Sequence, residues 1–276
     1  DWPEHRFGRS DVAIYGDFAM VSSQYNEWPQ SNVQGAVYVF GRDRQGVWSQ
    51  TQRLVLDDPV ETFYLTPAIA LRDKIAVIAG RKNAFVYEQD DSGSWLNSQT
   101  LTPSDSNTRF GDSVSFDGDH FLVGSKEDQD FKGAVYAFGR DANGVWSEVQ
   151  KFTANEPFSN FGSALDLNQD RVVVGSDGFE NSRGAAYVYQ ENEQGQWQQV
   201  VRLEATDGQD VDRFGSSVAI SDESIFVGAP EANLGGAINA GAVYVFAINE
   251  LGQWTQSQKL AVPNVGSFGF DVAVFS

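Results

Sequence analysis

The chain has 276 residues, enough for one large domain or two small ones, and its 41% hydrophobic share excludes wholesale disorder. Its 38 acidic and 19 basic residues give a formal net charge of −19, which disfavours binding to nucleic acids and to anionic lipid surfaces. The lack of cysteine excludes disulfides, thiolate zinc sites and cysteine nucleophiles, and no apolar run approaches the roughly 18 residues of a membrane span.

A repeated unit runs along the chain. Five tryptophans each follow an aromatic residue by eight positions, and the pairs are Phe40 and Trp48, Tyr87 and Trp95, Phe138 and Trp146, Tyr189 and Trp197, and Phe246 and Trp254. Phe-Gly pairs recur along the chain at Phe7-Gly8, Phe110-Gly111, Phe161-Gly162, Phe214-Gly215 and Phe268-Gly269. From Phe7 to Phe268 the step is about 52 residues.

Each unit contains four short apolar or alternating runs separated by turn residues. In the fifth unit these runs are 217–220, 225–227, 242–246 and 254–260. Four strands repeated at this step are typical of β-propeller blades, which bury their faces against neighbouring blades. The predicted fold is therefore an all-β propeller, one domain over 1–276. Its repeats cover about 7–64, 65–109, 110–160, 161–213 and 214–267, and a partial sixth covers 268–276.

The repeat resembles the FG-GAP family, which is also found in the heads of integrin α-subunits. The segments that carry the resemblance read FGSSVAI at 214–220, VGAP at 227–230 and GAVY at 241–244, closest to the bacterial version. The second unit departs from the pattern, with Leu65-Thr66 in place of Phe-Gly. The resemblance implies a propeller and leaves two arrangements open: five blades that close, or part of a ring of six or seven.

The loops between the second and third strands differ in length from unit to unit. They span 13 residues in the first and fifth units, 9 in the third and fourth, and 3 in the second. Variable loops on a rigid scaffold are where binding normally resides. We therefore expect ligand binding on the face that carries the strand 2–3 and 4–1 loops. The candidate contacts there are Tyr25, Trp28, Phe131 and Phe179, with Phe158 beside them. Trp28 also fits a role as a packed plug of the rim.

One strand 1–2 turn is a candidate calcium site. The calcium-binding members of the resembled family carry acidic and amide ligands at alternate positions there, and this chain has Asp166, Asn168 and Asp170. The glycine and the final carboxylate of that pattern are missing. An ordinary turn explains the same residues, because turns favour Asp and Asn for backbone reasons. Calcium therefore stays one of two interpretations, and no other cofactor is expected.

No catalytic constellation is recognisable. The two histidines, His5 and His120, fall on opposite faces in the repeat register, and no nucleophile elbow, phosphate loop or zinc spacing occurs. We therefore expect a non-enzymatic recognition or adhesion module, secreted, periplasmic or at the cell surface, with a protein or glycan ligand. The alternatives are a polysaccharide hydrolase or lyase that uses acidic residues on the same face, and a structural part of a larger chain or surface assembly.

Overall fold

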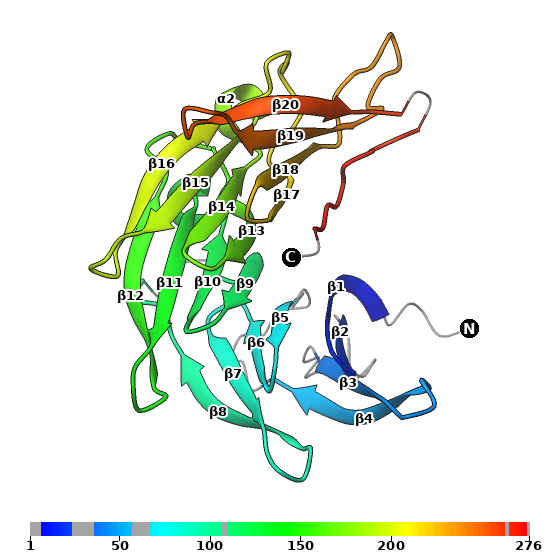
Figure 1. Ribbon diagram of the computed structural model, residues 1–276, viewed down its shortest axis with the longest axis vertical. Helices are drawn as coiled ribbons and strands as arrows, with labels where there is room; N and C mark the ends of the chain where they lie inside the picture. Colours follow the sequence, from blue (N-terminus) through cyan, green and yellow to red (C-terminus); the bar gives the residue numbers. More distant parts are fainter. Residues whose placement is uncertain (1–6, 24–35, 57–66, 106–109, 263–264, 275–276) are drawn as a thin grey trace. The chain divides into compact units, whose positions relative to one another are not determined.

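The computed structural model describes residues 7–23, 36–56, 67–105, 110–262 and 265–274. Within them, twenty strands form five four-stranded antiparallel sheets, and the other regular elements are two four-residue helical turns (Figure 1). The predicted fold class, an all-β protein of four-stranded propeller blades, is confirmed. Tyr25 and Trp28 lie outside the described residues.

The chain divides into two compact units, Asp1–Val123 with Gly139–Glu148, and Gly124–Phe138 with Val149–Ser276. The division passes through the third sheet. The first two sheets therefore belong to the first unit and the last two to the second. The single domain that we expected over 1–276 stays a prediction.

Every sheet is a meander in which consecutive strands are neighbours. The first two sheets consist of β1 (Phe7–Tyr15), β2 (Phe18–Ser23), β3 (Ala36–Arg42) and β4 (Trp48–Val55), and of β5 (Ala68–Arg72), β6 (Ile75–Ala79), β7 (Ala84–Gln89) and β8 (Trp95–Leu101). The third consists of β9 (Ser113–Asp117), β10 (His120–Ser125), β11 (Ala134–Arg140) and β12 (Trp146–Thr153), with α1 (Asp128–Phe131) between β10 and β11. The last two consist of β13 (Phe161–Asn168), β14 (Arg171–Ser176), β15 (Ala185–Glu191) and β16 (Trp197–Leu203), with α2 (Phe179–Ser182) after β14, and of β17 (Ser217–Ile220), β18 (Ser224–Ala229), β19 (Ala242–Ile248) and β20 (Trp254–Leu260).

Burial within a sheet follows the order of its strands. In β14 every residue after Arg171 is buried, as expected for a strand covered on both faces. In β16 the end residues Trp197 and Leu203 are buried, and four of the five residues between them are exposed. The continuous apolar runs of the sequence are therefore inner strands, and the polar runs that follow the tryptophans are outer strands.

Each unit has its own apolar core. In the first unit it contains Val37, Leu54, Ile78, Phe85 and Trp95. In the second it contains Val173, Val188, Phe214, Tyr244 and Phe246. In both units these side chains come from two consecutive sheets, so a single sheet does not complete its core alone.

A glutamine four residues after each of the first three repeat tryptophans joins consecutive sheets. Gln150 Oε1 accepts a 2.8 Å hydrogen bond from the backbone N–H of Trp197, and its Nε2 donates to the Trp197 carbonyl at 2.9 Å. Gln52 and Gln99 make the same pair of bonds to Trp95 and Trp146. We call this two-bond contact the amide clamp. It fixes the position of one outer strand, along its own axis, relative to the outer strand of the next sheet.

The Phe-Gly and Gly-Ala motifs meet where consecutive sheets touch. Gly184 forms a parallel bridge with Phe214. Its φ of +86° and the 2.0 Å that would separate an added Cβ from the Phe214 carbonyl oxygen leave room only for glycine. Phe268 makes the same bridge with Gly241. Apart from this bridge, the described residues 265–274 form no strand, and the partial sixth repeat that we expected over 268–276 stays a prediction.

Candidate functional site

The strand 2–3 loops of the third and fourth sheets contain short left-handed turns. In α1, Gln129, Asp130 and Phe131 have φ values of 47°, 59° and 64°. In α2, residues 180–182 have φ values of 45°, 58° and 62°. Left-handed backbone costs about 1–2 kcal/mol per non-glycine residue, so surrounding bonds must hold these turns. One such bond comes from the following 4–1 loop, where the Asn160 N–H donates to the Phe131 carbonyl at 2.9 Å.

Two exposed aromatic side chains stand on this face of the second unit. Phe131 is 45% exposed, and Phe158, in the loop between β12 and β13, is 66% exposed. Both have positive φ, 64° and 56°, which is a strained conformation for bulky residues. Phe131 and Phe158 were both expected on this face, and the hydrogen bond from Asn160 to Phe131 joins the two loops that carry them.

Phe179, also expected as an exposed contact, is only 3% exposed. The Arg202 guanidinium carbon lies 4.9 Å from the centroid of its ring and covers it. Phe179 therefore forms part of a cavity wall and not a protruding contact. Its exposure could not be read from its loop position, because the covering residue comes from β16.

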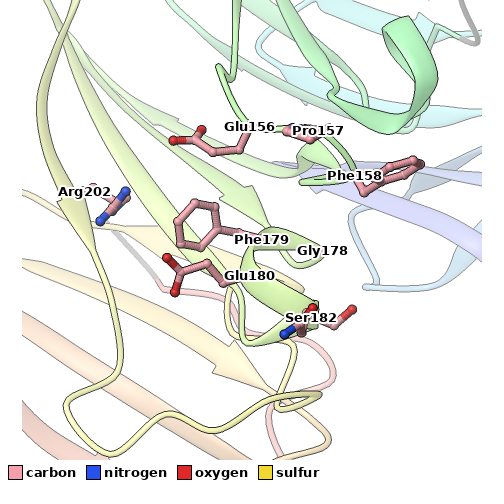
Figure 2. A pocket seen from close by; sticks show the side chains of 9 residues that line it. Glu156, Pro157, Phe158, Gly178, Phe179, Glu180, Ser182 and Arg202 are labelled. Atoms are coloured by element: carbon pink, nitrogen blue, oxygen red, sulfur yellow. The ribbon is translucent and has the colours of Figure 1, made fainter.

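A cavity of ≈ 490 Å³ opens beside Phe179. Its lining comes from the loop after β12, from α2 and its flanks, and from β16: Glu156, Pro157, Phe158, Gly178, Phe179, Glu180, Asn181, Ser182 and Arg202. Figure 2 shows the carboxylates of Glu156 and Glu180 and the guanidinium of Arg202 on one side of Phe179, with Phe158 pointing away from them. Acidic, cationic and aromatic groups thus line one opening.

A second cavity, of ≈ 360 Å³, shares Glu156 and Arg202 with the first. Tyr187, Tyr189 and Glu204 also line it. Arg202 Nε lies 2.7 Å from Glu204 Oε1. Burial and, to a lesser extent, the charge of Glu156 together raise the pKa of Tyr187 to about 12, and Arg202 opposes the shift. These groups therefore lie within electrostatic reach of one another.

An ion pair between a buried carboxylate and a half-exposed guanidinium lies among the loops around the first cavity. Asp177, which follows β14, pairs with Arg213 of the next 4–1 loop and accepts a 3.0 Å hydrogen bond from Asn160 Nδ2. Arg213 also lies 3.3 Å from Glu231. The two carboxylates raise the pKa of Arg213 although burial alone would lower it. The Asn160 bond fixes the 4–1 loop that carries Phe158 against the loop that carries Phe179, and the ion pair joins the loop of Phe179 to the next 4–1 loop.

The three candidate calcium ligands each have a protein partner. Asp166 Oδ2 accepts a 2.7 Å bond from the backbone N–H of Ile220, Asn168 donates to Asp222 at 3.2 Å, and Asp170 accepts from Gln190 at 3.0 Å. No group of three His, Cys, Asp or Glu side chains among the described residues could hold a metal ion. Calcium binding at this turn stays a prediction.

The repeat geometry agrees with what known proteins show. The FG-GAP repeat model matches the sequence at residues 95–138, 146–189 and 197–246, which together make up half of the chain. The chain belongs to the FG-GAP repeat family. Each matched FG-GAP repeat starts at the tryptophan of one sheet and ends in the third strand of the next, so the sequence repeat is offset by one strand from the sheet.

Solved structures share the fold at low sequence identity. A protein from Lactobacillus plantarum is 13% identical, with a TM-score of 0.60 over 95% of this chain and 86% of its own. A functionally unknown protein from Desulfotomaculum acetoxidans is 12% identical, with a TM-score of 0.63 over 95% of this chain and 72% of its own. These likenesses show the fold alone. The comparison with curated proteins gave no match.

Among the described residues, no helix has the length and apolar character needed to span a membrane.

The site residues that the sequence analysis did not single out are Glu156, Arg202 and Tyr187. The available signal was a broken repeat: Asp128 stands eight residues before Tyr136 in the third sheet, and Phe179 stands eight residues before Tyr187 in the fourth.

Proposed function

We propose that the protein is a recognition module for an extracellular or cell-surface ligand, a protein or a glycan. It binds through the strand 2–3 and 4–1 loop face of the second unit. The observation that carries the proposal is the pair Phe131 and Phe158, which are exposed and held in strained backbone conformations, with Phe158 at the edge of an open cavity. Strain of this kind persists where surrounding structure maintains it, and it collects at ligand contacts. Exposed aromatic side chains are frequent anchors in such interfaces.

A labelled chain tests this by pull-down from its native environment and by a glycan array. Phe131 and Phe158 lie outside the buried core, so replacing both with alanine is expected to retain the fold and to lower binding at least tenfold. The control is Leu251→Ala, which removes an 81% exposed residue from the β19–β20 turn at the opposite end of the sheet. Equal binding by the double variant and the wild type would rule the proposal out.

A second candidate is a polysaccharide hydrolase or lyase on the same face. It is favoured by the carboxylates of Glu156 and Glu180, which line one cavity with Arg202. Release of reducing or unsaturated sugar ends from a polysaccharide, abolished by Glu156→Gln, would establish it. Binding without any released ends supports recognition.

A further inference from the structure

In the second unit, a tyrosine of the third strand lies beside a basic residue of the fourth in the third, fourth and fifth sheets. In the third sheet, Tyr136 donates to Asp128 Oδ2 at 3.1 Å and Lys151 lies 2.7 Å from the same oxygen. In the fifth sheet, Tyr244 donates to Asp207 at 2.9 Å and Lys259 lies 2.7 Å from the Asp207 carboxylate. In both, the lysine Nζ is 4.9 Å from the tyrosine ring centroid. The acceptor for the tyrosine hydroxyl is a carboxylate each time.

The fourth sheet has the same pair, Tyr187 opposite Arg202, without the shared carboxylate. Phe179 occupies the place of Asp128. Glu156, which like Asp207 stands ten residues after a repeat tryptophan, does not take over the bond. Tyr187 is 5% exposed, and its hydroxyl proton has no acceptor among the described residues, since the neighbouring Arg202 can only donate. A buried donor without an acceptor is costly, and this one belongs to a residue that lines a cavity.

The charges around the cavities restrict what can supply the acceptor. Glu156, Glu180 and Glu204 stand against the single guanidinium of Arg202, so an anionic ligand is repelled. A cation cannot accept the bond that Tyr187 is able to donate. A neutral hydroxyl accepts from Tyr187 or Arg202 and donates to Glu156 or Glu204, so it satisfies both kinds of group.

We propose that these two cavities bind a neutral sugar, whose hydroxyls are held by Glu156, Arg202 and Tyr187, with Phe158 at the rim. The proposal rests on the recognition function argued above and names its ligand class and its site. The cavity volumes, ≈ 490 and ≈ 360 Å³, suit one or a few sugar units. Because the ligand supplies the missing acceptor, binding completes the arrangement that the third and fifth sheets close internally.

The test uses the full chain and an array of neutral, uronate and amino-sugar oligosaccharides, followed by calorimetric titration of the best neutral oligosaccharide. Tyr187→Phe removes one hydroxyl and is expected to weaken binding about 2- to 12-fold, the effect of one net hydrogen bond. The same variant loses an unsatisfied buried group, so its melting temperature should stay equal or rise. The matched control Tyr244→Phe loses a satisfied bond, so it should melt lower and bind like the wild type.

The outcomes separate this inference from the proposed function. Binding confined to uronate or amino-sugar oligosaccharides overturns the neutral-sugar inference, as does neutral-sugar binding that Tyr187→Phe leaves unchanged. Capture of a protein partner that depends on Phe131 and Phe158, with no sugar bound, also overturns the inference but retains the recognition function. A lower melting temperature for Tyr187→Phe would show that the hydroxyl already has an acceptor, and that result removes the premise.

Discussion

At the scale of single residues, buried tyrosines of the second unit determine the response to alkaline pH. Burial raises the pKa values of Tyr187, Tyr189 and Tyr244 to about 12, from an ordinary value of 10.0. A folded pKa above the unfolded one means that this contribution to stability is complete below pH 10.0 and is lost as the pH rises to about 12. We predict that the free energy of unfolding falls across that window, measured by urea denaturation at stepped pH.

Phenolate absorbance of the native protein provides the check on this prediction, and Tyr189→Phe provides the control. The native titration should contain a fraction of phenols that ionise well above the others, and Tyr189→Phe should make that fraction smaller. If all phenols of the native protein ionised near the ordinary value, these side chains would not be buried as described.

The Asp166 side chain has two competing roles that one variant distinguishes. Its 2.7 Å bond to the Ile220 N–H links β13 to β17 without any metal. Asp166→Ala leaves that N–H without its partner, and the free energy of unfolding should fall by about 1–3 kcal/mol in calcium and in EDTA alike. Asp170→Ala, at a half-exposed position, should cost much less. A loss for Asp166→Ala that appears only in calcium would instead establish the calcium site.

At the scale of the element, the amide clamp joins β4 to β8, β8 to β12 and β12 to β16. Gln150→Ala removes both bonds to the Trp197 backbone and leaves those groups partly buried, so we predict a loss of about 1–3 kcal/mol in the free energy of unfolding. Gln198→Ala removes an exposed glutamine from β16 and should change stability by less than about 0.5 kcal/mol. Equal effects of the two variants in chemical denaturation would refute the structural role of the clamp.

The strands were predictable from the sequence and the loops were not. In every repeat the aromatic residue lies in the third strand and the tryptophan begins the fourth strand eight residues later. The positions and the order of the strands follow from this constant spacing. The left-handed turns at 129–131 and 180–182 contain no glycine and depend on hydrogen bonds from the following loop. Local sequence preference therefore gives no sign of them. The burial of Phe179 likewise depends on Arg202, which is 23 residues away in sequence.

From the sequence we could predict the face of the protein that carries the candidate site, but not the cavities on it. The positions of Phe131 and Phe179 follow from the repeat register, which places both in strand 2–3 loops. The cavities follow from a difference between repeats, because Phe179 replaces an aspartate and Arg202 replaces a lysine. This difference can be interpreted only because Tyr136 of the third sheet and Tyr244 of the fifth are each seen to donate to a carboxylate, Asp128 and Asp207.

At the scale of the whole molecule, the net charge of −19 opposes folding through self-repulsion. Salt screens this repulsion, and it also screens the attraction within ion pairs, but several of the ion pairs are exposed. Arg42 and Asp17 are 44% and 63% exposed, and Lys74 and Asp91 more so. Exposed pairs contribute about 0–1 kcal/mol each, so their loss is small against relief of the repulsion. We therefore predict that the melting temperature rises as NaCl is raised from low to near-molar concentration.

Two substitutions test the cause of that rise. Glu193→Lys and Glu250→Lys reverse exposed charges in the two 3–4 hairpin turns of the second unit, where the structure gives neither carboxylate an ion pair among the described residues. Together they bring the net charge from −19 to −15, so the slope of melting temperature against salt should decrease while the value in high salt stays the same. If the melting temperature of the wild type fell with added NaCl, attractive pairs would outweigh the excess of carboxylates.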